Sequence, residues 1–234
     1  MSARETILQS IRHALNVTGG EAPRRMAVDE RLARAPGGVI PARGQGDAAA
    51  RLETFKSEAA RAQATIAEVA SFADAPAEIM RYLRDNNLPA TLRMGEDKRL
   101  AAMPWDATLL EISHGASDGH DLNAVSAAFA AVAESGTLAL ASGADNPTTL
   151  NFLPDNHIVV LAAADIGADY EAVWARLRAV YGKGAMPRTL NFITGPSRSA
   201  DIEQTLLLGA HGPRRLHIVL VTGDPPALGA QAAE

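Results

Sequence analysis

Apolar residues recur at the spacing of an α-helix in several stretches of the chain. The first helix is predicted just after Ser2, because Ser2 and Glu5 fit a capping box and the apolar residues that follow share one helical face. The same spacing returns in three later segments, which begin at residue 47 or cover residues 76–86 and 170–181. Asp47 suits a helix start and Pro76 suits the first turn of a helix, and all three segments are predicted as helices.

Short apolar runs alternate with these helices and are predicted to form strands. They lie at residues 64–70, 88–94, 107–112, 138–141, 158–162, 190–194 and 216–221. The alternation of helix and strand predicts an α/β domain with a mostly parallel sheet.

Two further segments are predicted as helices from their residue types. The segment 123–133 is rich in alanine, the strongest helix former. The segment 197–208 begins with two serines that suit an N-cap, followed by Asp201 and Glu203 in the first turn. A helix there would make residues 190–221 a strand–helix–strand unit of a parallel sheet.

The distribution of Gly and Pro predicts the domain boundaries. Residues 18–46 are rich in Gly, Pro and Arg and show no sustained period, which is typical of an extended segment. The expected organisation is an N-terminal helix and extended arm over 1–46, an α/β domain over 47–222 and a flexible tail over 223–234.

Composition narrows the fold and the partners. Of 234 residues, 47% are hydrophobic but only 4% are aromatic, which favours helices packed on a sheet over an all-β sandwich. The net charge is −5 and no basic stripe is present, so no nucleic acid is expected as a partner. No apolar run approaches the roughly 20 residues that span a bilayer, and no signal-peptide core is visible, so a cytoplasmic protein is expected.

The chain contains no cysteine, which excludes disulfides, thiol catalysis and cysteine-ligated iron–sulfur clusters within it. No P-loop or dinucleotide motif indicates a nucleotide. Residues 113–121 include two histidines and two aspartates, which suit zinc or iron, but their spacing matches no ligand motif. No metal site is therefore predicted.

Two places carry candidate chemistry. The run Gly-Pro-Ser-Arg-Ser at residues 195–199 would bring backbone donors, two hydroxyls and a guanidinium to one anion, although a well-capped loop with a solvated Arg198 is the alternative. Glu134 precedes a strand and lies beside Gly136, which would let a ligand approach, so it is a candidate general base or nucleophile. The alternative for Glu134 is a carboxylate in solvent at a helix end.

Three blocks resemble the LUD (lactate utilization domain) family. They are AESGTLALAS at 133–142, LNFLPDNHIVVL at 150–161 and FITGPSRSADIEQTLLLGAHGPRRLHIVLV at 192–221. Ser135 and Ser199 stand where the family usually has Thr, which keeps a hydroxyl and removes a methyl group.

The resemblance implies a three-layer α/β fold like that of ribose-5-phosphate isomerase, CoA transferases and formyltetrahydrofolate cyclo-ligase. It also implies a role in oxidising L-lactate to pyruvate beside two partner subunits with iron–sulfur and cysteine-rich domains. The absence of cysteine fits this division, because iron–sulfur clusters would lie in the partners and no cofactor is expected in this chain.

Folds of this kind bind ligands at the carboxyl ends of their strands, so the motif residues are expected to gather there. Glu134 is the predicted catalytic base, and Arg198 is assigned to the carboxylate of lactate or pyruvate. The predicted substrate-binding residues are Ser135, Gly136, Thr137, Gly195, Ser197, Arg198, Ser199 and Arg214. Two other functions stay open: a stand-alone enzyme for a CoA ester or sugar phosphate, and a carboxylate-binding regulatory subunit.

Overall fold

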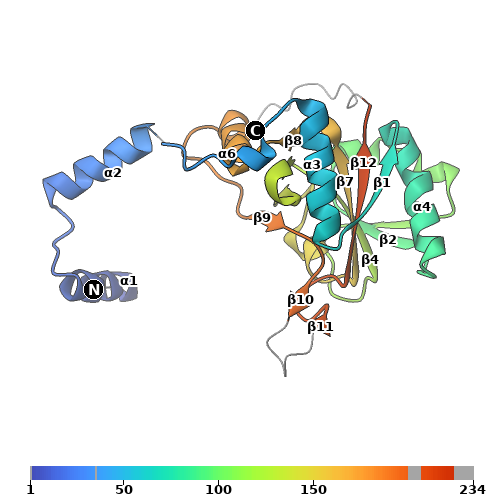
Figure 1. The fold of residues 1–234 in the computed structure, drawn as a ribbon. Coiled ribbons are helices and arrows are strands. Elements are labelled where there is room, and N and C mark those ends of the chain that lie inside the picture. Colours follow the sequence, from blue (N-terminus) through green and yellow to red (C-terminus); the bar gives the residue numbers. More distant parts are fainter. Residues whose placement is uncertain (1, 35, 200–206, 224–234) are drawn as a thin grey trace. The chain divides into compact units, whose positions relative to one another are not determined.

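The computed structural model describes residues 2–34, 36–199 and 207–223. Contacts within the chain divide it into two compact units, Met1–Ile40 and Pro41–Glu234. In the described residues, the first unit contains two helices, and the second contains two larger β-sheets, a two-stranded hairpin and the helices that cover the sheets (Figure 1).

The first unit consists of α1 (Ala3–Ala14) and α2 (Ala22–Arg34). The predicted capping box is confirmed, because Glu5 N–H donates to Ser2 Oγ at 3.3 Å and Ser2 N–H donates to Glu5 Oε2 at 3.0 Å. Helix α2 lies where an extended arm was predicted. The Gly and Pro residues of this segment gather at its two ends, and the residues between them are mostly good helix formers.

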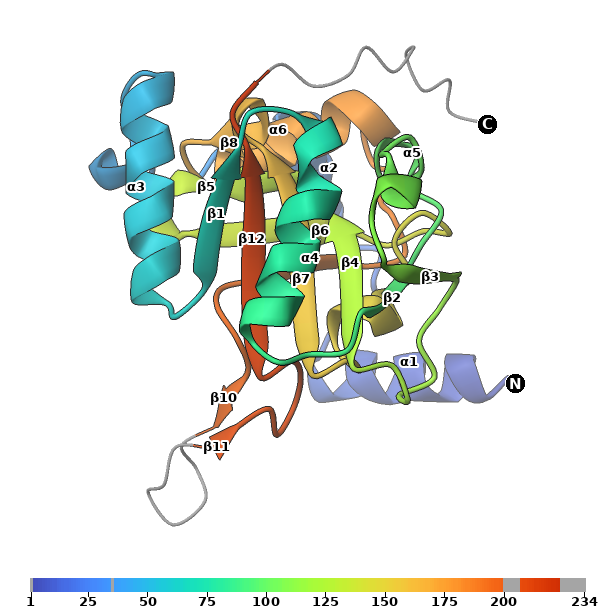
Figure 2. The ribbon, with the colours of Figure 1, turned by 90° about the vertical axis from the view of Figure 1, so that its right-hand side faces the viewer.

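The second unit is built on a six-stranded sheet in which all neighbouring strands are parallel (Figure 2). From edge to edge, its strands are β1 (Thr65–Val69), β12 (Arg215–Val221), β7 (Asn156–Ala162), β4 (Asn123–Ala127), β2 (Thr91–Met94) and β3 (Glu111–His114). The central strands β7 and β12 are buried on both faces, which explains why each is a nearly continuous apolar run.

Each face of this sheet has its own core. On one face pack α4 (Ala75–Asp85) and the short α5 (Lys98–Ala101), and α4 crosses the near face in Figure 2. On the other face pack α3 (Ala48–Arg61) and a second sheet. Side chains alternate between the two cores as strand geometry requires: Val219 joins the first and Ile218 the second.

The second sheet has four strands, in the order β8 (Ile166–Gly167), β5 (Ala130–Val132), β6 (Thr137–Ala141) and β9 (Leu190–Ile193). Helix α6 (Tyr170–Tyr181) covers its outer face through Val173. Short 3-10 turns lie at Ala42–Gly44, Phe72–Asp74, Trp105–Ala107, Ala133–Ser135, Thr148–Asn151 and Ala163–Asp165. The α/β class and the mostly parallel sheet are confirmed, and the second sheet was not foreseen.

Local signals located most elements correctly. Helices α3, α4 and α6 lie where they were predicted, and so do the strands β1, β2, β6, β7, β9 and β12. Strand β3 begins at Glu111, four residues later than predicted.

The predicted helix at 123–133 is wrong. The segment forms β4 and β5, and every residue of both strands is buried. Strand β4 pairs with β7 on one side and β2 on the other, so burial on both faces outweighs the helix propensity of alanine.

The strand–helix–strand unit at 190–221 is also wrong. Strand β9 pairs antiparallel with β6 in the second sheet, whereas β12 lies in the central sheet. Arg198–Ser199 (β10) pairs antiparallel with Leu207–Leu208 (β11), so these residues form a hairpin instead of a helix. Residues 200–206 and 224–234, which include much of the predicted helix and tail, lie outside the described residues.

Candidate functional site

Glu134 occupies the 3-10 turn that joins β5 to β6, and only 6% of it is exposed. Its N–H donates to the Ala168 carbonyl at 3.2 Å, and Gly44 packs against its Cβ. Within the described ranges, no hydrogen bond or ion pair reaches its carboxylate. The burial of this residue argues against a fully exposed carboxylate at a helix end, and the catalytic role stays a prediction.

Four hydroxyl groups meet beside this turn. Thr137 Oγ1 lies 2.6 Å from Thr194 Oγ1, 2.8 Å from Ser135 Oγ and 3.1 Å from the Tyr170 hydroxyl. Thr137 is fully buried. The cluster therefore joins the start of β6 to the end of β9 and the first residue of α6, which gives the predicted residues Ser135 and Thr137 a structural role.

Two of the predicted glycines lie against helix α3. Both have left-handed backbone angles, with φ +64° at Gly136 and +75° at Gly195. A Cβ at Gly136 would collide with the backbone nitrogen of Ala59, and one at Gly195 with the carbonyl oxygen of Ala62. At both positions, the absence of a Cβ lets the backbone of α3 approach closely.

The two motif segments Gly-Pro-Ser-Arg and His-Gly-Pro-Arg meet at Ser197. Its N–H donates to the Pro213 carbonyl at 2.8 Å, and its Oγ accepts from the His211 N–H at 3.3 Å. Arg214 follows Pro213 and immediately precedes β12, so this junction lies at the amino end of the strand. The expectation that Ser197 and Arg214 lie at the carboxyl ends is therefore wrong.

A cavity of about 430 Å³ opens next to this junction, at the amino ends of β1 and β12. We call it the amino-end cavity. Among the described residues that line it, the charged ones are Arg81, Arg214 and Arg215, and none is an aspartate or glutamate. Register explains the gathering, because Thr65 of β1 lies opposite His217 of β12 and both line the cavity.

Arg81 and Arg214 differ in how closely carboxylates already pair with them. Arg81 Nε lies 2.7 Å from Glu78, and its Nη1 lies 2.8 Å from Asp85. Arg214 approaches Asp155 only to 3.6 Å, and both of those side chains are largely exposed. Arg214 is therefore the arginine with most freedom to bind a further anion. Arg198 is exposed on β10 and does not line the cavity.

His217 forms the floor of the cavity and is only 3% exposed. Its ring stacks on Tyr82 with centroids 3.8 Å apart, its Nδ1 lies 2.8 Å from Thr65 Oγ1, and its Nε2 has no hydrogen-bond partner. Burial lowers the pKa of His217 to about 4, although Glu78 at 3.6 Å opposes the shift. The imidazole is therefore neutral at pH 7.

Sequence reasoning missed Arg81, Tyr82 and His217 as site residues. The one available signal was His217, a polar residue inside the apolar run 216–221. Arg81 and Tyr82 read as ordinary residues of a surface helix, and only the packing of α4 on the sheet brings them to His217.

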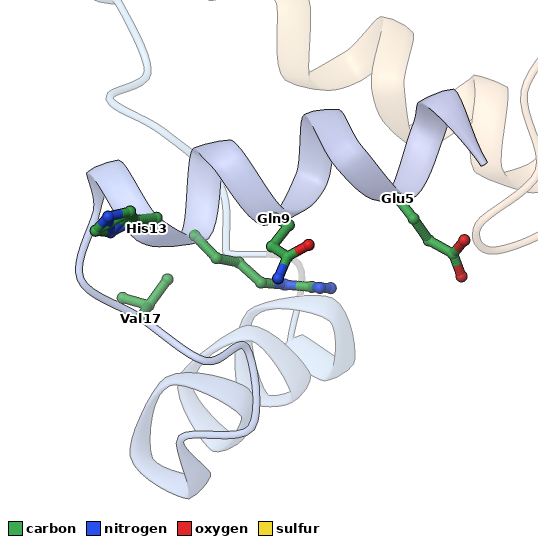
Figure 3. Close-up of a pocket in the computed structure, with 5 residues that line it drawn as sticks. Glu5, Gln9, His13 and Val17 are labelled. Atoms are coloured by element: carbon green, nitrogen blue, oxygen red, sulfur yellow. The ribbon is translucent and has the colours of Figure 1, made fainter. Parts of the chain in front are cut away.

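Other features of the described residues give weaker candidate sites than the amino-end cavity. No group of three or more His, Asp or Glu residues in that part of the chain could hold a metal ion. A hollow of about 520 Å³ lies beside α1, and Figure 3 draws the exposed side chains that line it, among them Glu5 and His13. One helix and the turn after it supply the lining, so no second wall encloses a ligand. No described helix is long and apolar enough to cross a membrane.

Comparison with known proteins identifies the family of this chain. The family model of the LUD domain matches residues 123–221. A lactate utilization protein C from Exiguobacterium sp. is 30% identical over 180 residues, which are 73% of this chain and 77% of that protein. The chain belongs to the lactate utilization protein C family. The resemblance to LUD proteins that the three motif blocks indicated is thereby confirmed.

Other members of the lactate utilization protein C family match over shorter spans. Relatives of that name from Geobacillus sp. (strain WCH70) and Geobacillus thermodenitrificans are 41% and 39% identical over 92 residues, and the chain spans only 38% of their length. The crystal structure of a DUF162 family protein from Deinococcus radiodurans covers 76% of this chain and 99% of its own, with 22% identity and a TM-score of 0.54. This structural likeness establishes a shared fold.

Proposed function

We propose that this chain takes part in lactate utilization, as a component of an iron–sulfur-dependent system that oxidises L-lactate to pyruvate. The observation that carries the proposal is family membership: the relative that aligns with 73% of this chain is named for lactate utilization. Electron transfer through clusters is assigned to two partner subunits with iron–sulfur and cysteine-rich domains, because this chain has no cysteine.

Within this role, the amino-end cavity is the proposed binding site for a small carboxylate such as lactate or pyruvate. Arginine guanidinium binds a carboxylate through two parallel hydrogen bonds, and Arg214 has the weakest existing partner of the three arginines. The Tyr82 hydroxyl suits the hydroxyl or keto oxygen of such an acid.

The first test asks whether lactate oxidation needs this chain. The chain is co-expressed with neighbouring genes that encode iron–sulfur proteins, and lactate-dependent dye reduction is measured with and without it. We expect activity only when the chain is present. Equal activity without it would refute the proposal as a required component, and stabilisation by CoA or a sugar phosphate would favour a separate enzyme of the same fold.

The second test separates the two candidate arginines. Pyruvate is titrated calorimetrically into the full chain and into the variants Arg214→Gln and Arg198→Gln. Loss of one charged, paired hydrogen bond costs about 1.5–3 kcal/mol, so Arg214→Gln should weaken binding by about tenfold or more. Arg198→Gln serves as the control and should bind as the unaltered chain does. The reverse result would restore Arg198 as the anchor and remove the amino-end cavity from the proposal.

A further inference from the structure

A second cavity lies at the edge of the second sheet. It has a volume of about 210 Å³ and lies between α3, β8 and the first turns of α6. We call it the α3–α6 cavity. None of its lining residues is shared with the amino-end cavity.

Its charged lining residues are Arg51 from α3, Asp165 from the turn before β8 and Arg176 from α6. Small residues form much of the remaining wall, including Gly167 and Ala172. The cavity is smaller than the roughly 300–1,000 Å³ of sites for drug-sized ligands, so it suits a small group and not a nucleotide.

Arg51 lacks a partner for its charge. Its Nε is buried and makes no hydrogen bond. Among the residues that the structure describes, no ion pair or hydrogen bond reaches its guanidinium. A buried donor without a partner destabilises the folded chain, and a bound anion that accepts from it would remove this cost.

Asp165, in contrast, is already neutralised. Arg176 Nη1 lies 2.5 Å from its Oδ1, and Arg99 Nη1 lies 3.8 Å from its Oδ2. The Arg176 guanidinium also stacks over the Phe129 ring at 5.2 Å, which fixes its position. Because Asp165 is paired from two sides, Arg51 gives the cavity an unbalanced positive charge.

We propose that the α3–α6 cavity binds a small oxyanion, such as a phosphate or carboxylate group, between Arg51 and Arg176. Arg51 supplies the charge that has no other partner, and Arg176 supplies a second, positioned guanidinium. The inference is independent of the proposed role in lactate utilization and of the amino-end cavity.

Calorimetric titration of the full chain tests the proposal, with inorganic phosphate and with acetate as separate probes at constant ionic strength. The Arg214→Gln variant is titrated in parallel to exclude binding in the amino-end cavity. We expect saturable binding of at least one probe that persists in Arg214→Gln and that, in this background, is weakened about tenfold or more by Arg51→Gln. The better probe identifies whether a phosphoryl or a carboxylate group is preferred. Arg178→Gln, an exposed arginine on α6, is the matched control and should leave binding unchanged.

A stability measurement separates ligand binding from a structural role. Arg51→Met removes the unpartnered charge, so without anion the variant should unfold at the same or a higher urea concentration than the unaltered chain. In the Arg214→Gln background, addition of the anion should stabilise the chain with Arg51 and not the chain with Arg51→Met. Absence of saturable binding in that background, binding there that survives Arg51→Gln, or destabilisation by Arg51→Met without anion would each overturn the proposal.

Discussion

The substitution Gly136→Ala should destabilise the second unit, and the structure gives the size of the effect. Gly136 has φ +64° and ψ 29°, and adopting this left-handed conformation costs a non-glycine residue about 1–2 kcal/mol. The new Cβ would also collide with backbone atoms of Glu58 and Ala59 in α3. Backbone atoms cannot turn aside as a side chain can, and such overpacking costs about 1–3 kcal/mol. The two effects together predict a loss of about 2–5 kcal/mol.

Gly184→Ala is the matched control. Gly184 has φ +83°, but a Cβ there would have no atom within 4 Å. Only the backbone cost of about 1–2 kcal/mol should remain.

The free energy of unfolding of both variants is measured by urea titration followed by circular dichroism, and the slopes are compared to check that the transition is unchanged. The larger loss should belong to Gly136→Ala, because only that variant displaces α3, which carries the fully buried Phe55 and Ala59. Equal losses in the two variants would refute the reasoning that α3 packing requires glycine at position 136.

Two further predictions concern ionisable groups. His217 has a pKa of about 4 in the folded chain against 6.5 when unfolded, so its contribution to stability is complete above pH 6.5 and is lost as the pH falls toward 4. From pH 7 to 5, protonation of His217 should account for about 2 kcal/mol of the lost free energy of unfolding. His217→Phe keeps the stacking on Tyr82, so in urea titrations at the two pH values it should lose about 2 kcal/mol less than the unaltered chain. An equal loss in the variant and the unaltered chain would contradict the lowered pKa of His217. Glu134→Gln should lower lactate-dependent turnover of the assembled system, and full activity would remove Glu134 as a base.

The elements that sequence alone predicted well depend on neighbours in the chain. Asp47 caps α3 by accepting from the Ala50 N–H at 2.8 Å, and the span of α6 follows directly from its spacing of apolar residues. Strands β7 and β12 could be read from their apolar runs, although not their position at the centre of a parallel sheet.

The elements that sequence misplaced depend on distant partners. An alanine-rich segment favours a helix in isolation, but residues 123–127 fill a gap between β7 and β2 where both faces are covered. The composition of strand β9 would suit a buried strand in either sheet. Only its pairing with β6 determines that it belongs to the second sheet. No local signal could distinguish these outcomes, because the deciding contacts join residues far apart in the chain.

The candidate site likewise combines features that the sequence indicates with features that only the tertiary structure determines. The sequence by itself indicated the Gly-Pro-Ser-Arg segment as candidate chemistry and determined that clusters ligated by cysteine cannot lie in this chain. Only the tertiary structure decided that Gly136 and Gly195 face α3, that Arg214 joins Arg81 and His217, and that the shared cavity opens at the amino ends of the strands. The physical reason is that residue type sets what a side chain can bind, whereas sheet register and helix packing set which side chains meet.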